Sequence, residues 1–277
     1  MKERTLVVFT LLAQMAVGIF WALGAMRFLG TDLNLTLGFL VVAALMVLAI
    51  AASFLHLGSP LLAWRALWNP RSSWLSREIW GTVLFGAASV LYAALLWFDR
   101  GSPLLRAIIL GAAAVLGLLL LLSMSWAYRL RTVPAWNSWA TPLSFLVTAL
   151  LLGVLGSVVL VELFAEPSVS VPLRRWAAVG AIALLCVEFL FLPLWLVNLA
   201  GRGGAAARAL RRVVQERRAL FQLRLVLMIV AVVLAGLWLT AWVGWGPLLW
   251  LPTGLVVLAS EILGRILFYA AYTREGV

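Results

Sequence analysis

The segment Leu35–Leu57, LTLGFLVVAALMVLAIAASFLHL, decides the fold class of this chain. It runs for 23 residues, and His56, next to its end, is its one side chain that can carry a charge. A helix needs about 20 predominantly apolar residues to cross the hydrocarbon core of a bilayer, so the segment predicts a transmembrane helix. An open sheet is excluded there, because lipid offers no partners for unpaired backbone groups.

Seven further segments share this length and apolar character, and the full set is Thr5–Leu29, Leu35–Leu57, Arg77–Phe98, Pro103–Tyr128, Pro142–Phe164, Arg174–Leu199, Gln222–Val243 and Pro247–Tyr272. Only 11% of the chain is charged, against about 25% in soluble domains. We therefore expect an all-α membrane protein, with eight transmembrane helices in two four-helix bundles and one integral membrane domain over residues 1–277. The first segment is too long for a signal peptide, so we expect it to be retained.

The positions of Lys and Arg predict the orientation of the chain, whose net charge is +11. With alternating connections, 15 basic residues fall on the face shared by both termini and by the connections after the second, fourth and sixth segments, and five fall on the other face. Positively charged connections stay in the cytoplasm. We expect a multi-pass protein of the cytoplasmic membrane with both termini inside the cell.

The connection from Arg202 to Arg224 is rich in arginine and can form a basic amphipathic helix on the membrane surface. Two interpretations stay open. The segment either only satisfies the charge bias of cytoplasmic connections, or it docks a soluble partner or anionic lipid. The candidate docking residues on this face are Arg65, Arg71, Arg131, Arg211, Arg212, Arg217 and Arg218.

The chain contains one histidine, His56, and one cysteine. These residues are too few to ligate a pair of haems, a zinc ion or an iron–sulfur cluster, so we expect no metal ligands. Any electrons must then pass to a molecule that the chain does not bind covalently. His56 lies at the predicted cytoplasmic end of the second segment. An imidazole, with an unperturbed pKa near 6.5, is well placed there to exchange a proton with a lipid-borne ligand.

Several polar side chains fall in the same membrane half as His56. Depth follows from the rise of about 1.5 Å per helical residue, and the set near His56 is Gln14, Glu78, Arg265 and Tyr269, with Trp136 in a connection on that side. All of them fall at one membrane face, although no feature of the sequence requires this arrangement. We therefore expect one binding site at the cytoplasmic rim.

Two glutamates lie deeper in the predicted helices. Ionisable groups at the bilayer centre cost about 2.5–3.5 kcal/mol on insertion scales. Glu261 precedes Arg265 by four residues, so the two share a helix face and can form an ion pair. Glu188 has no helical neighbour of opposite charge. Each glutamate is either a packed structural group or part of a proton route.

Several short motifs, taken together, resemble a known family. In chain order they are Gln14 with Gly18, Leu55–Pro60 (LHLGSP), Leu75–Ile79 (LSREI), Thr132–Trp136 (TVPAW), Thr141–Pro142, and Glu261–Arg265 (EILGR) with Phe268–Tyr269. Their order and spacing are similar to those of the DmsC-type membrane anchor subunits of DMSO-reductase-type molybdoenzymes, within the wider NrfD-like group. The resemblance extends from the first segment to the eighth.

The resemblance implies a set of partners and a ligand. A catalytic subunit would carry a molybdenum or tungsten bis-pterin cofactor, and a ferredoxin-like subunit would carry iron–sulfur clusters. The anchor itself would bind a quinone, menaquinone or ubiquinone, without a redox centre of its own. The family's quinol-site histidine corresponds to His56, and Glu78, Arg265 and Tyr269 are expected beside it.

The direction of electron flow is a separate question. The best-known members of the family face outward, whereas the charge bias here places His56 inside. This orientation is similar to the cytoplasm-facing branch of sulfite-oxidising complexes (SoeC), and we expect electrons to flow from a substrate such as sulfite to quinone. The alternatives are a DMSO- or polysulfide-type reductase anchor that oxidises menaquinol, a secondary transporter, and a passive anchor without quinone.

The predicted orientation can be tested with reporters. Green fluorescent protein fused after Val277 is expected to fluoresce, and alkaline phosphatase fused there to be inactive, because both termini are predicted in the cytoplasm. As a control, fusions in the connection between the first two segments should give the opposite pattern. An active phosphatase at Val277 would contradict the charge argument.

Overall fold

The computed structural model describes residues 2–29, 33–56, 68–164, 171–240 and 246–275. The long helices are α1 (Lys2–Phe28), α2 (Thr36–His56), α3 (Trp74–Trp97), α4 (Pro103–Ala127), α5 (Ala140–Phe164), α6 (Val171–Ala200), α8 (Arg218–Thr240) and α9 (Gly246–Ala270). All eight are long and apolar enough to cross a membrane. No strand occurs among the described residues, so the predicted fold class is confirmed.

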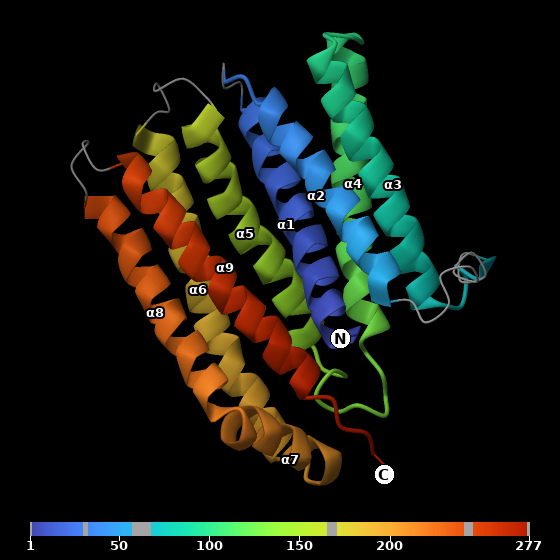
Figure 1. Cartoon of the computed structure of the whole chain (residues 1–277), viewed down its shortest axis with the longest axis vertical. Coiled ribbons are helices and arrows are strands. Elements are labelled where there is room, and N and C mark those ends of the chain that lie inside the picture. Colours follow the sequence, from blue (N-terminus) through green and yellow to red (C-terminus); the bar gives the residue numbers. More distant parts are fainter. Residues whose placement is uncertain (1, 30–32, 57–67, 165–170, 241–245, 276–277) are drawn as a thin grey trace.

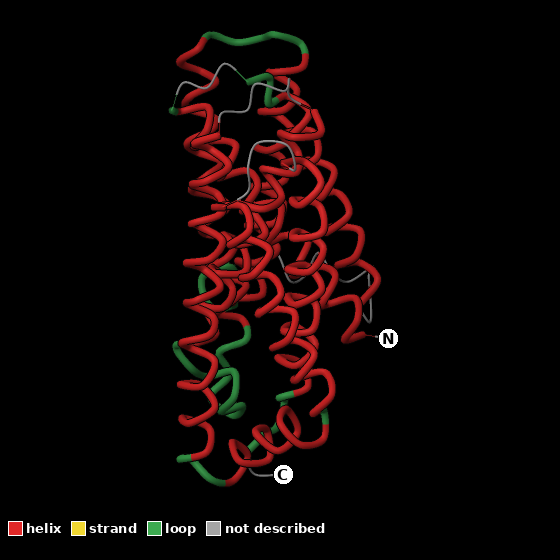
Figure 2. Tube along the Cα trace, turned by 90° about the vertical axis from the view of Figure 1, so that its left-hand side faces the viewer, coloured by secondary structure: helices red, strands yellow, loops and turns green. Residues whose placement is uncertain are grey.

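The long helices alternate in direction, as Figure 1 shows. Helices α1, α3, α5 and α8 begin, and α2, α4, α6 and α9 end, at the end of the molecule where the short helix α7 (Gly204–Arg211) lies. We call this end the α7 end. Figure 2 shows the long helices running along the long axis of the molecule, with a short helical segment crossing at the α7 end.

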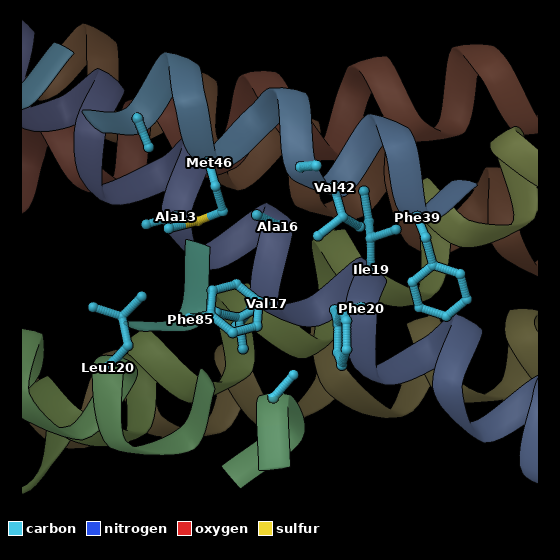
Figure 3. Packing of buried hydrophobic residues seen from close by; sticks show 14 of the residues in the cluster. Ala13, Ala16, Val17, Ile19, Phe20, Phe39, Val42, Met46, Phe85 and Leu120 are labelled. Carbon is cyan, nitrogen blue, oxygen red and sulfur yellow. The ribbon is translucent and has the colours of Figure 1, made fainter. Parts of the chain in front are cut away.

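The helices form two bundles, as expected. Helices α1 to α4 surround one apolar core, and α5, α6, α8 and α9 surround a second. In the first core the ring of Phe20 meets the rings of Phe39 and Phe85 edge-on, with centroids 5.3 and 5.6 Å apart (Figure 3). Helix α1 packs extensively against both α2 and α5, so it joins the two bundles.

Close contact between α1 and α5 depends on two glycines. A Cβ atom on Gly18 would overlap the carbonyl oxygen of Ala149, and one on Gly153 would overlap the backbone of Gly18. Small residues at such contacts let transmembrane helices approach closely, and their packing replaces the hydrophobic driving force that lipid does not supply. The seam between the bundles is therefore set by backbone contact.

The basic connection predicted from Arg202 to Arg224 is helical but shorter than expected. Helix α7 buries three of its alanines, and a π-helical turn, η2 (Arg212–Glu216), leads into α8 at Arg218. Arg208 and Arg212 donate hydrogen bonds of 2.9 and 2.8 Å to backbone carbonyls that follow α9, those of Arg274 and Tyr272. Arg224 thus lies inside a transmembrane helix, because α8 begins six residues before it.

The α1–α5 seam gives a testable prediction. Replacing Gly153 by Ala is expected to destabilise the protein by about 1–3 kcal/mol, the usual cost of overpacking, because the new methyl group meets backbone that cannot rotate away. Gly111→Ala is the matched control, since a Cβ there has nothing within 4 Å. The measurement is the thermal unfolding midpoint in detergent, and equal midpoints for the two variants would contradict the prediction.

Candidate functional site

Arg265 of α9 occupies the centre of the candidate site. It is 4% exposed, and its guanidinium donates a 2.8 Å hydrogen bond to the side-chain oxygen of Gln14 on α1. The Gln14 amide in turn donates a 2.9 Å bond to the backbone carbonyl of Phe145 on α5. The guanidinium carbon also lies 3.9 Å from the centre of the Phe145 ring, a favourable cation–π contact. Three helices from both bundles therefore meet at one buried cation.

The expected ion pair between Glu261 and Arg265 is not formed. No charged atoms of the two residues come within 4.0 Å, whereas Arg224 on α8 lies 3.9 Å from Glu261. The helical spacing brings the pair onto one face, but side-chain direction depends on what the neighbouring helices offer. Arg265 contacts Gln14 on α1 and the ring of Phe145 on α5. Its guanidinium therefore points away from Glu261.

Aromatic side chains surround Arg265 on the side toward the α7 end. The Tyr269 and Tyr128 hydroxyl oxygens are 2.8 Å apart in a hydrogen bond. The indole nitrogen of Trp136 donates a 2.7 Å bond to the carbonyl of Phe268, and the two rings stack with centroids 5.3 Å apart. Trp136 comes from the α4–α5 connection, so the connection is folded into the bundle end.

Glu78 approaches this aromatic group from α3. Ser73 caps that helix by accepting a 3.3 Å hydrogen bond from the backbone of Ser76, which fixes Glu78 in the first turns. The Glu78 side chain is buried and lies within electrostatic range of the hydroxyls of Tyr128 and Tyr269. The structure thus brings together five residues that the sequence predicts to share a site: Gln14, Glu78, Trp136, Arg265 and Tyr269.

His56 is the last residue of α2, at the same end of the molecule. Its side chain lies outside the described part of the chain, as do Leu57–Pro60 and Arg65. Its participation in the site therefore remains a prediction. Of the other predicted docking residues, Arg71, Arg131, Arg211, Arg212, Arg217 and Arg218 are all exposed.

The two deep glutamates meet next to Arg265. Glu188 on α6 lies 3.4 Å from the guanidinium of Arg224, and Glu261 lies 3.9 Å from the same group. The second oxygen of Glu261 accepts a 2.5 Å hydrogen bond from Thr148 on α5. Gly264 makes room for Arg224, because a Cβ there would lie 2.6 Å from the guanidinium carbon.

This carboxyl and guanidinium group lines a pocket between α5, α6, α8 and α9. The cavity volume is about 70 Å³, which is room for several water molecules and far below the volume of a typical small-molecule site. Its walls combine polar groups with the rings of Phe191, Trp195, Phe221 and Phe268. Arg265 belongs both to this pocket and to the aromatic group. Arg265 therefore lies between two groups of polar residues, one toward α3 and α4 and one toward α6 and α8.

Sequence reasoning missed Tyr128 and Arg224. The chain has four tyrosines, and three of them pack around Trp136: Tyr128, Tyr269 and Tyr272. Because tyrosine is so scarce in this sequence, each one could have been considered as a site residue. Arg224 falls in the overlap between the predicted basic connection, which ends at Arg224, and the predicted segment Gln222–Val243, and counting it with the connection hides its place inside the bundle. No group of three or more His, Cys, Asp or Glu side chains is arranged to hold a metal ion within the described ranges.

Comparisons with known proteins identify the family of this chain. A family model described as the DMSO reductase anchor subunit matches residues 1–271. The sequence is 30% identical to the DmsC-type chain of the anaerobic dimethyl sulfoxide reductase of Escherichia coli, over 99% of this chain and 96% of that protein. It is 27% identical to YnfH, an anaerobic dimethyl sulfoxide reductase chain of the same organism, with the same coverage.

A shorter similarity links the protein to a sulfite dehydrogenase subunit. It is 40% identical to one subunit of the sulfite dehydrogenase of Allochromatium vinosum over 87 residues, which is 31% of this chain and 26% of that protein. The family model and the E. coli reductase protein, by contrast, match almost from end to end. This chain belongs to the family of DMSO reductase anchor subunits, and is a membrane-spanning member of it.

Proposed function

We propose that this chain is the quinone-binding membrane anchor of a molybdoenzyme complex, and that the quinone head group binds at the α7 end between His56 and the Arg265 group. The observation that carries this proposal is the convergence of Gln14, Glu78, Trp136 and Tyr269 around the buried Arg265 in a member of the anchor family. A purely structural anchor has no need for so many buried polar groups within a membrane.

The residues of this group fit a quinone head group chemically. Hydroxyl, guanidinium and imidazole groups are hydrogen-bond donors for its carbonyl oxygens, and flat rings such as Trp136 and Phe268 pack well against an aromatic face. When bound, quinone supplies the chemistry of accepting two electrons and two protons. The chain's own part is to position the ring and to hold protons, at the imidazole of His56 and the carboxyl of Glu78.

The partners follow from the family. Its relatives are components of dimethyl sulfoxide reductases and of a sulfite dehydrogenase, so we propose a molybdopterin catalytic subunit and an iron–sulfur subunit as partners here. The exposed arginines at the α7 end offer a positively charged surface for docking the iron–sulfur subunit beside the quinone. With this end in the cytoplasm, electrons would pass from a substrate such as sulfite to quinone.

Two other interpretations differ in what supports them. The end-to-end similarity to the E. coli dimethyl sulfoxide reductase protein favours a reductase that oxidises menaquinol as the second candidate. The family assignment gives no support to the alternative of a secondary transporter. A passive anchor without quinone is the remaining alternative, and it is an outcome of the experiment below.

One test of this function replaces His56 in the intact complex, purified with its molybdenum or tungsten and its iron. His56→Phe is expected to lower quinone-linked turnover about 10- to 100-fold, the loss of one charge-assisted hydrogen bond of about 1.5–3 kcal/mol. Turnover with a soluble dye, which bypasses the anchor, should not change. Assays with sulfite and with dimethyl sulfoxide establish the direction. Unchanged quinone-linked turnover would favour the passive anchor.

A further test concerns the hydrogen-bonded pair of Tyr128 and Tyr269. Tyr269→Phe is expected to raise KM for a quinone analogue about 5- to 150-fold, for a loss of about 1–3 kcal/mol, because it removes the hydroxyl bonded to Tyr128. The matched control is Tyr92→Phe, which lies in the aromatic core of the first bundle, away from the site. A change in KM of equal size in both variants would show a general packing effect and contradict the assignment.

A further inference from the structure

The buried carboxyl groups of Glu188 and Glu261 come from different helices and face the same guanidinium, that of Arg224, at 3.4 and 3.9 Å. They are 1% and 3% exposed. One oxygen of each side chain, Oε1, has no hydrogen-bond partner among the described residues, and neither has Nε of Arg224. All three residues line the same pocket. A buried polar atom without a protein partner is costly unless water satisfies it.

The charges around the two carboxyls do not balance if both are ionised. Arg224 is the one cation within ion-pair distance of them in the described part of the chain. Arg265, the other charged group facing the pair, is drawn to Gln14 and to the rings of Phe145 and Phe268. The side chain that α5 contributes is the neutral Thr148. One guanidinium therefore serves two carboxyl groups in a low-dielectric interior.

We propose that Glu188 and Glu261 form a proton-binding pair, which holds one proton between the two carboxyl groups and exchanges it with water in the pocket. Neighbouring carboxylates in a buried site cannot both remain charged without strong compensation, so such pairs titrate as a unit. Release of the proton to pocket water takes the pair from one negative charge to two, and uptake reverses the change.

The pocket extends from the pair toward the α7 end. Its lining includes Val213 of η2 and Ala135 in the α4–α5 connection, both at that end and both buried. Thr141 and Ser144 add hydroxyl groups to the lining. Water held by these groups would carry the proton toward the α7 end, and Arg265 separates the pair from the tyrosine group.

A role in quinone chemistry for this pair rests on the function proposed above, whereas its binding of a proton does not. Two protons accompany the two electrons that quinone takes up, and a proton store beside the site shortens their transfer. The test therefore measures the proton itself, so that its failure and the failure of quinone binding are distinguishable.

The experiment is infrared difference spectroscopy on the intact complex near neutral pH. A protonated carboxyl group gives a C=O stretching band separate from those of carboxylates and amides. The wild-type minus Glu188→Gln spectrum is expected to contain this band, and the band should shift when the complex is transferred to D2O. The absence of the band, or a band that does not respond to D2O, would overturn the proposal.

Matched variants show whether the proton is shared. Glu188→Gln and Glu261→Gln should each abolish the band, because the remaining carboxyl is left alone beside Arg224 and ionises. Glu162→Gln is the control, since Glu162 forms two hydrogen bonds, of 2.5 and 3.0 Å, with Arg174 elsewhere in the bundle. A band that survives in Glu261→Gln would place the proton on Glu188 alone and contradict the shared pair.

A second substitution changes the band in the other direction. In Gly264→Ala the added methyl group would lie 2.6 Å from the guanidinium carbon of Arg224, so the cation must move away. Without it, both carboxyl groups should be protonated, and the band is expected to grow roughly twofold. This variant keeps both glutamates, so it tests the proposal even if the glutamine variants do not assemble, and an unchanged band would contradict it.

Discussion

The burial of one cation, Arg265, is the constraint on which the rest of this site depends. A guanidinium inside a membrane protein must be satisfied by nearby acceptors and rings, and here Gln14 and Phe145 provide them from α1 and α5. Because α9 carries the cation and α1 belongs to the other bundle, this interaction adds a polar link between the two bundles at the depth of the site. The glycine seam between α1 and α5 makes the close approach possible.

Polar groups are arranged on both sides of Arg265, with different chemistry. Toward α3 and α4 lie neutral hydroxyl and indole groups beside Glu78, which suit hydrogen bonding to a carbonyl ligand. Toward α6 and α8 lie two carboxyls and a second guanidinium around a pocket. The proposed quinone site and the proposed proton pair are therefore neighbours that share one residue, Arg265.

Much of this protein could be predicted from its sequence, because a bilayer restricts the choices. Segments of about 20 apolar residues must be helices, so the eight spans and the all-α class followed directly. The scarcity of polar residues inside those spans also made the site residues conspicuous. Gln14, Trp136, Arg265 and Tyr269 were predicted to converge, and the structure brings them together. For His56 the sequence argument still stands alone.

The partners of each charged side chain were decided only by the tertiary structure. Helical spacing predicts that Arg265 pairs with Glu261. In the structure Arg265 instead donates a hydrogen bond to Gln14 on α1, and Glu261 lies near Arg224 on α8. Glu188, without a charged neighbour in its own helix, found one on α8. A sequence determines which residues share a helix face, since that depends on local periodicity. Which faces meet depends on the packing of all eight helices, and so on contacts between residues far apart in the chain.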